Sequence, residues 1–251
     1  MREPPHDEAS NLILYGMNSP NVTKVVIMLE ELELPYELHH VAVFGGEQFT
    51  PQFLGVNPLG KVPVLVDPLL PGPLAESGAI LFWLAERSGR LLPVDGPARY
   101  EIMQWLMVQM SSIGPMLGQL NHFRLLPKDS EPYAHGRYLA LARRLYGLLN
   151  ERLRGREWLA GDAYSIADIA TYPWARYLEQ HGFEAGHHPS LTRWRNTIAQ
   201  TAAVKRAEQR MSEAFNALST QTRRAATQED LDRFFGRTAD MPPADFTSVT
   251  K

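Results

Sequence analysis

The spacing of apolar residues divides the chain into two unlike parts. In the first third, short apolar runs alternate with segments of helical spacing, such as the one that contains Val22, Val25 and Leu29. Four short strands are predicted there, over Leu12–Tyr15, Tyr36–Val43, Val62–Val66 and Pro73–Ala75. A helix predicted over Ser77–Arg87 follows the last strand. Residues 11–88 are therefore expected to form an α/β layer.

Residues 89–97 combine helix-stopping and turn residues, a composition that predicts a linker. Beyond it the apolar residues keep helical spacing, and helices are predicted over residues 98–113, 133–154, 165–176, 190–201 and 203–218. Gly114-Pro115 and Gly118 predict a bend after the first of these helices. Ser165 and Asp168 form a capping-box pattern at the start of the third. We expect residues 98–218 to form an all-helical domain.

The last segment, residues 219–251, is polar apart from Leu231, Phe234, Phe235 and Met241. A weak helix is predicted near Asp230, where it could dock on the body of the protein or on a partner. The composition of the segment is more typical of a mobile extension than of an ordered one.

Composition narrows the class of protein. With 251 residues and 44% hydrophobic content, the chain can hold one large domain or two small ones. A net charge of -3 gives no electrostatic argument for binding nucleic acid. Met1–Glu8 contains acids and prolines where a signal peptide needs an apolar core, and no run approaches the ~18 apolar residues of a membrane span. We therefore expect a cytoplasmic protein without a nucleic-acid or membrane partner.

The chain contains no cysteine, which excludes disulfide bonds, cysteine–metal sites and a protein thiol as nucleophile. The His-Glu-x-x-His spacing and the Gly-x-Ser-x-Gly pattern are also absent from the sequence, so neither metal-dependent hydrolysis nor a hydrolase triad is favoured. We expect no metal, and any thiol chemistry must arrive with a ligand.

Two short motifs point to a ligand. Pro63 begins a predicted strand, where a cis bond after Val62 would leave the N–H and C=O of Val62 to pair with an extended ligand. Ser77 can cap the following helix, and its hydroxyl and the free N–H groups of the first turn attract a carboxylate. Glu76 supplies the negative charge that an ammonium needs. Although Glu76 and Ser77 could be a simple capping pair, the combination predicts a receptor for a small peptide.

These residues resemble the glutathione site of the glutathione transferase superfamily, and the resemblance covers residues 11–215. Further matching motifs are Ser19–Asn21, Gly46–Phe49, Asn57–Lys61, Gly114–Gln119 and Asn121–Phe123. This set is similar to the Nu-class branch, bacterial proteins related to a yeast prion regulator of nitrogen metabolism. The resemblance implies a thioredoxin-like domain followed by an all-α helical bundle. It also implies a homodimer, for which we expect residues 98–113 to form the contact surface.

A bound thiol reacts readily only when its thiolate is stabilised, because a free thiol has a pKa of ~8.5 and lowering it by two units takes ~2.7 kcal/mol. The resemblance implies that Asn21 and Ser19 supply donors for that thiolate, with serine at a position where threonine is usual. Ser-Pro is also an ordinary N-cap pair, so capping is an equal alternative for Ser19. Asn21 is a poor helix former, which favours the functional interpretation.

The resemblance assigns further ligand contacts. Lys61 meets the glycine carboxylate of glutathione or a second ligand, with a solvated surface lysine as the alternative. Gln48 and Arg137 match ligand-contacting positions of the Nu branch. For Arg137, the alternative is a surface ion pair.

The resulting hypothesis is a glutathione-dependent disulfide-bond reductase that binds one or two glutathione molecules, or one glutathione disulfide, in each site. The bound thiolate attacks a substrate disulfide and a second glutathione resolves the mixed disulfide, so no protein cysteine is needed. Two alternatives stay open. One is a transferase that conjugates glutathione to small electrophiles, and the other is a non-catalytic glutathione-binding regulatory protein.

Overall fold

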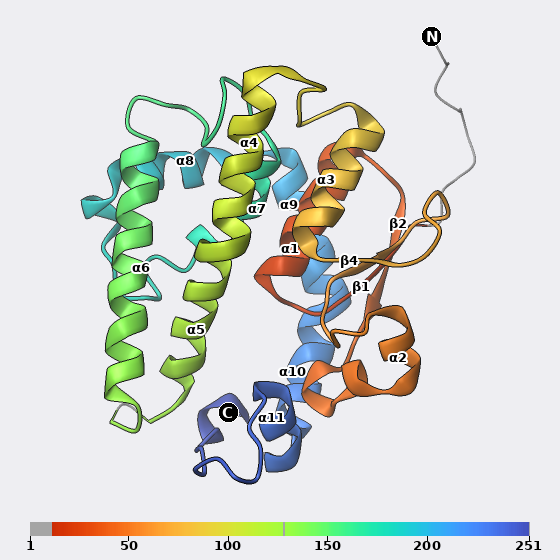
Figure 1. Ribbon diagram of the computed structural model, residues 1–251, viewed down its shortest axis with the longest axis vertical. Coiled ribbons are helices and arrows are strands. Elements are labelled where there is room, and N and C mark those ends of the chain that lie inside the picture. The colour runs from red at the N-terminus through yellow and green to blue at the C-terminus, as the bar shows by residue number, and fades with distance from the viewer. Residues whose placement is uncertain (1–11, 128, 251) are drawn as a thin grey trace.

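The computed structural model describes residues 12–127 and 129–250, in which a sheet with its helices packs beside a helical bundle (Figure 1). The sheet has the strand order β2-β1-β3-β4. Its strands are β1 (Leu12–Gly16), β2 (Tyr36–His40), β3 (Val64–Val66) and β4 (Leu74–Ala75). β1 runs parallel to β2 and antiparallel to β3, and β4 is antiparallel to β3. This is the thioredoxin-like arrangement that the resemblance implies.

The two faces of the sheet bury different clusters, because side chains alternate along each strand. Leu14 and Leu65 pair across neighbouring strands and join the main core. Val64 belongs to a smaller cluster with Phe53. The main core includes α1 (Pro20–Leu32) and α3 (Ser77–Ser88), and the smaller cluster lies under α2 (Pro51–Val56).

Residues 89–95 form no helix or strand, and the helical part follows them. Its helices are α4 (Gly96–Val108), α5 (Gly114–Leu125), α6 (Pro132–Arg152), α7 (Ile166–Ala175), α8 (Pro189–Ala199), α9 (Ala202–Met211), α10 (Ala217–Ala225), α11 (Gln228–Phe235) and α12 (Thr247–Thr250). Short 3₁₀ turns are η1 (Val43–Gly45), η2 (Glu47–Phe49) and η4 (Ala185–His187), and π-helical turns are η3 (Gln109–Ile113) and η5 (Ser212–Asn216).

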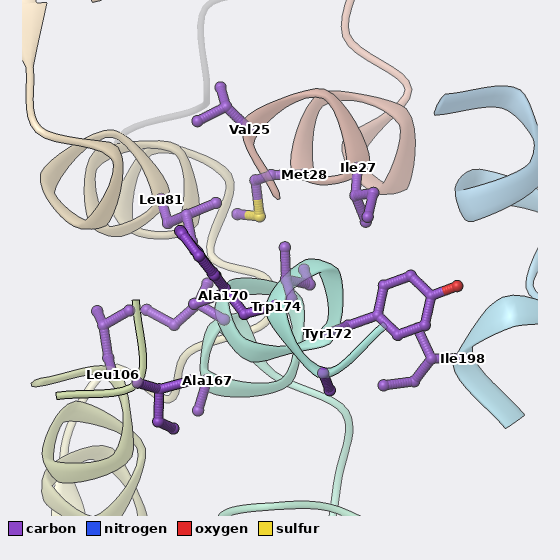
Figure 2. Close-up of a cluster of buried hydrophobic side chains, with 14 of the residues drawn as sticks. Val25, Ile27, Met28, Leu81, Leu106, Ala167, Ala170, Tyr172, Trp174 and Ile198 are labelled. Carbon is purple, nitrogen blue, oxygen red and sulfur yellow. The ribbon is translucent and has the colours of Figure 1, made fainter. Parts of the chain in front are cut away.

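Helix α7 joins the two parts of the molecule. Ala170 and Trp174 of α7 lie among Met28 of α1, Leu81 of α3 and Leu106 of α4 (Figure 2). Burying each large apolar side chain of this kind contributes about 1.5–3 kcal/mol. The position of α7 is therefore determined by helices from both halves of the chain.

The start of α7 is fixed by the predicted capping box, which the structure confirms. The carboxylate of Asp168 is fully buried and accepts hydrogen bonds from the N–H and the hydroxyl of Ser165. It also accepts from the Leu159 N–H at 2.9 Å and from the Trp194 indole N–H at 2.8 Å. Burial raises the pKa of Asp168 to about 6, against the opposing effect of these donors. Asp168 therefore ties α7 to α8 and to the segment before it.

Three local details differ from the sequence-based expectations. β2 ends at His40 rather than Val43, because the chain turns into η1 after the Val41 N–H bonds to Gly16. α2 is absent from the predictions, although Thr50-Pro51 is the same N-cap signal as Ser19-Pro20 and the Thr50 hydroxyl accepts from the Phe53 N–H at 3.3 Å. The bend expected at Gly114-Pro115 is the π-helical turn η3, which precedes these residues, since Gly114 and Pro115 already begin α5.

The expectation of a mobile extension after residue 218 is wrong for the residues that the structure describes. α10 continues to Ala225, and α11 forms around Asp230 as predicted. Leu231, Phe246 and Val249 are buried in a cluster of their own. Average composition missed this order because the few apolar residues of the segment are spaced so that they share one face of a helix.

The expectation that the start of the chain is not a signal peptide rests on Met1–Glu8, which lies outside the described residues. Within the described ranges, no helix has both the length and the apolar character needed to cross a bilayer. The cytoplasmic location stays a prediction.

Candidate functional site

A cavity of about 390 Å³ lies where the sheet domain meets α5, α7 and η3. Six of the predicted site residues line it: Asn21, Lys61, Val62, Pro63, Glu76 and Ser77. The helical part contributes Gln109, Met110, Gly114, Gly118 and Trp174. The cavity is thus built by both halves of the chain.

One wall of the cavity is an open backbone edge at Val62. The bond between Val62 and Pro63 is cis, as the sequence predicts. Asn57 shapes the preceding loop, because its Nδ2 donates to the Lys61 carbonyl at 2.7 Å and its Oδ1 accepts from the Leu59 N–H at 3.1 Å. Within residues 12–127 and 129–250, the backbone groups of Val62 have no hydrogen-bond partner. An extended peptide can therefore pair with them as an added strand.

The start of α3 places the negative charge of Glu76 beside the positive end of the helix dipole. Glu76 has a φ of 68° and a ψ of 110°, a left-handed conformation that costs about 1–3 kcal/mol in a residue other than glycine. It occupies the N-cap position, so Ser77 begins the helix instead of capping it, which corrects the prediction. Among the described residues no side chain caps α3, so its first N–H groups can bind a carboxylate next to the carboxylate of Glu76.

Asn21 lies in the first turn of α1, and α7 fixes the orientation of its amide. The Trp174 indole N–H donates to Asn21 Oδ1 at 3.1 Å. An indole N–H cannot accept a hydrogen bond, so Asn21 must turn its oxygen toward Trp174 and its NH₂ group away from it. The two N–H donors of Asn21 are therefore available to a ligand in the cavity.

Gly114 and Gly118 of α5 lie against this indole. A methyl group at Gly114 would lie 3.6 Å from Trp174 Nε1, and one at Gly118 would lie 3.4 Å from the indole ring. The two glycines are four residues apart and therefore face the same side of α5. Their spacing provides the surface on which the indole rests.

The sequence analysis missed Lys24 and Gln109. Lys24 is fully buried in α1, and its Nζ donates to Gln109 Oε1 at 2.8 Å. Burial lowers the pKa of the Lys24 ammonium to about 7, and the carboxylate of Glu76 opposes this decrease. The signal in the sequence was a lysine within a largely apolar stretch. In the structure its neighbours Thr23 and Val25 are buried as well.

Three predicted site residues do not line this cavity. The Ser19 hydroxyl caps α1 by accepting from the Val22 N–H at 3.4 Å, and Ser19 lines a separate hollow. Gln48 is buried in η2, and its Oε1 has no partner among the described residues. Arg137 lies exposed on α6 and borders a different depression. Their roles as ligand contacts stay predictions.

The cavity can bind and orient a ligand, but the chain has no cysteine to provide a thiol. Backbone groups, amide donors and a helix N-terminus match an extended peptide with an amino-acid head. In the part of the chain that the structure describes, no three His, Asp or Glu side chains gather as a metal site.

Replacing Lys24 with methionine should change the pH dependence of stability. Between pH 7 and 10.5 the folded protein has lost the Lys24 proton while the unfolded chain keeps it, so the free energy of unfolding rises with pH. The slope approaches about 1.4 kcal/mol per pH unit and is absent in Lys24→Met. Urea unfolding at pH 7, 8 and 9 measures the difference between the two proteins.

The matched control for this experiment is Lys205→Met, because Lys205 also donates to a glutamine but is exposed. It should keep the wild-type pH dependence. A Lys24→Met protein whose stability follows pH in parallel with the wild type would contradict the lowered pKa.

Two family models match the chain, the N-terminal domain of glutathione S-transferase over residues 18–87 and its C-terminal domain over residues 129–202. The disulfide-bond oxidoreductase YfcG of Escherichia coli is 40% identical over 199 residues, which cover 77% of this chain and 93% of YfcG.

Solved structures give the same result. A glutathione transferase from Pseudomonas putida, with one glutathione disulfide bound per subunit, has a TM-score of 0.73 and 39% identity, over 78% of this chain and 90% of the other. A glutathione transferase from Burkholderia graminis, with two glutathione molecules bound per subunit, has a TM-score of 0.72 and 46% identity. The match covers 78% of this chain and 87% of the other. The two matched domains, the fold and these relatives together show that the chain belongs to the glutathione transferase family of enzymes.

Proposed function

We propose that this protein is a glutathione-dependent disulfide-bond reductase of the Nu class, acting in the cytoplasm. The observation on which the proposal rests is the cavity that unites a free backbone edge at Val62, the Glu76–Ser77 pair and the oriented amide of Asn21. Because the chain has no cysteine, the thiol that reacts belongs to the bound tripeptide.

The three parts of the cavity correspond to the three parts of glutathione. The ammonium of the γ-glutamyl group pairs with Glu76, and its carboxylate binds at Ser77 and the start of α3. The central cysteine pairs with the backbone of Val62, as an added strand does. Lys61 lies beyond Val62 and binds the glycine carboxylate. Gln48 and Arg137 are assigned to the ligand by the resemblance alone.

The thiol of the bound peptide then lies near the start of α1. The NH₂ group of Asn21 donates to the sulfur, and the positive end of the α1 dipole favours the thiolate over the thiol. Ser19, which caps the same helix, supports the thiolate by holding that helix end in place. Each such contribution is about 0.3–2 kcal/mol, so several together supply the ~2.7 kcal/mol that two pKa units require.

The reaction is thiol–disulfide exchange in two steps. The bound thiolate attacks one sulfur of the substrate disulfide, forms a mixed disulfide and releases the other sulfur as a thiolate, which takes up a proton. A second glutathione attacks the mixed disulfide, so the products are two reduced thiols and one glutathione disulfide. The relatives with two glutathione molecules or one glutathione disulfide per subunit support a site that holds both peptides.

Parallel assays separate this reaction from its alternatives. With glutathione present, we expect the protein to reduce hydroxyethyl disulfide faster than it conjugates chlorodinitrobenzene. The opposite order of rates would favour a conjugating transferase. Glutathione binding by calorimetry, without turnover of either substrate, would indicate a regulatory binding protein.

The role of Asn21 predicts a separation of turnover from binding. Asn21→Ala should lower kcat for disulfide reduction about ten- to hundred-fold, because a donor to the reacting anion is lost. The dissociation constant of glutathione should change little, since Val62, Glu76 and Ser77 still anchor it. Trp174→Phe, which frees the Asn21 amide to rotate, should reproduce part of the loss.

Asn196→Ala is the control for this series. Asn196 is exposed on α8, and α8 contributes no residue to the lining of the cavity. It should behave as the wild type does. Unchanged turnover in Asn21→Ala would remove the role assigned to Asn21.

We also propose that the protein is a homodimer that uses the outer face of α4. Tyr100 is 76% exposed and Met107 is 50% exposed, and the exposed Gln104 lies between them on the same face of the helix. Large apolar side chains that share one exposed face are typical of an interface. Sedimentation at micromolar concentration should give a dimer, and Tyr100→Glu with Met107→Glu should give a monomer.

The control for the dimer is Leu218→Glu, which places a glutamate at an exposed leucine of α10. This variant should remain a dimer. A monomeric wild type at the same concentration would refute the proposed interface.

A further inference from the structure

The fully buried amino group of Lys24, whose pKa is lowered to about 7, lies beneath one end of the cavity. The Nζ of Lys24 contacts the Sδ of Met110 at 3.7 Å, and the Ser77 hydroxyl contacts the same sulfur at 3.9 Å. A methyl group at Gly78 would lie only 2.9 Å from Met110, so α3 and η3 approach closely here. Lys24 and Ser77 therefore contact the same thioether sulfur.

The surroundings of Lys24 compensate its charge poorly. An ammonium has three donors, but within the described residues its partners are one amide oxygen, from Gln109, and the thioether of Met110. Glu76 is the charged group that favours the ammonium, and Asp168 of the adjacent α7 is bound to other donors. A buried cation that lacks a close anion is costly, and it stabilises any anion that binds near it.

The amide of Gln109 shows the same imbalance. Because an ammonium cannot accept a hydrogen bond, Gln109 must turn its oxygen to Lys24, and its NH₂ group points elsewhere. That nitrogen is buried and has no partner among the described residues. A methyl group at Gly114 would come within 2.9 Å of it, so the glycine makes room for the amide. The hydrogen bond from Lys24 orients the amide.

We propose that Lys24 is the counter-charge for the carboxylate of the ligand's amino-acid head, a role that rests on the glutathione site proposed above. The ammonium of that head pairs with Glu76 and cancels part of the negative field at Lys24. The carboxylate of the ligand, bound at Ser77 and the start of α3, again places a negative charge near Lys24. Lys24 acts across the Met110 side chain, where the low dielectric of the interior strengthens the attraction. It thereby selects peptides whose amino-acid head has a free carboxylate.

Proton uptake follows from this arrangement. A nearby anion favours the charged form of a lysine, so a ligand with the carboxylate keeps or adds the Lys24 proton. A ligand with a neutral amide in that place still neutralises Glu76 and therefore removes part of the support for the ammonium. The two ligands should differ in the number of protons that the protein exchanges on binding.

The test uses S-methylglutathione, which has no thiol proton, and its analogue in which the γ-glutamyl α-carboxylate is an amide. Calorimetry at pH 7.5 in two buffers of different ionisation enthalpy gives both the affinity and the proton count. For the wild type we expect a preference for the acid over the amide that is at least about ten-fold greater than the preference of Lys24→Met. Amidation lowers the pKa of the ligand's own α-ammonium to about 8, so the analogue itself takes up protons when it pairs with Glu76, equally in both proteins. We therefore expect the proton uptake with the acid, minus the uptake with the amide, to be larger in the wild type than in Lys24→Met.

Lys205→Met should retain both wild-type values, and circular dichroism checks that Lys24→Met is folded. If that variant does not fold, Lys24→Gln, which keeps a hydrogen-bonding side chain without the charge, replaces it in both measurements. An unchanged preference for the acid in the variant, or an unchanged difference in proton count between the two ligands, would overturn the role of Lys24 and leave the glutathione site standing. A wild type that binds neither ligand would overturn both proposals.

Discussion

The hydrogen bond from Trp174 to Asn21 is the interaction on which the rest of the cavity depends. It joins α7 of the helical part to the first turn of α1, and it determines which end of the Asn21 amide faces a ligand. α7 can present the indole because Asp168 fixes the start of the helix, and the indole packs against α5 at Gly114 and Gly118. A hydrogen bond weakens steeply outside a narrow range of distance and angle, so the two halves must keep one relative position.

Unfavourable features gather around this same cavity. Glu76 has a positive φ, the amino group of Lys24 is fully buried, and the side-chain nitrogen of Gln109 has no partner within residues 12–127 and 129–250. Each costs on the order of 1–3 kcal/mol, and the surrounding helices must offset it. The buried carboxylate of Asp168, by contrast, has four donors and serves the fold. Other buried polar atoms without a partner among the described residues, such as Gln48 Oε1, lie away from this cavity. Those that border the cavity are the ones that a ligand with complementary charges can satisfy.

The features that could be predicted are those whose physical cause lies within a few residues. The capping box at Ser165, the bond between Val62 and Pro63 and the order of strands and helices all depend on local sequence. The partners of Trp174 and Lys24 could not be predicted, because they lie 153 and 85 positions away and meet only through packing. The position of Ser77 within α3, not at its cap, likewise depends on the backbone angles of Glu76.

The C-terminal segment shows why composition alone misjudged order. Its helix α11 places Phe234 against Phe44 of η1 and Phe235 against His122 of α5. Two adjacent rings on one short helix therefore contact both halves of the molecule, and without them Phe44 and His122 would lose these apolar contacts. The segment thus contacts both the loop before Gln48 and the end of α5. It is a second connection between the two domains, in addition to the hydrogen bond between Trp174 and Asn21 at the cavity. The average polarity of the segment does not reveal this role, because a few well-spaced apolar residues are enough to dock a helix.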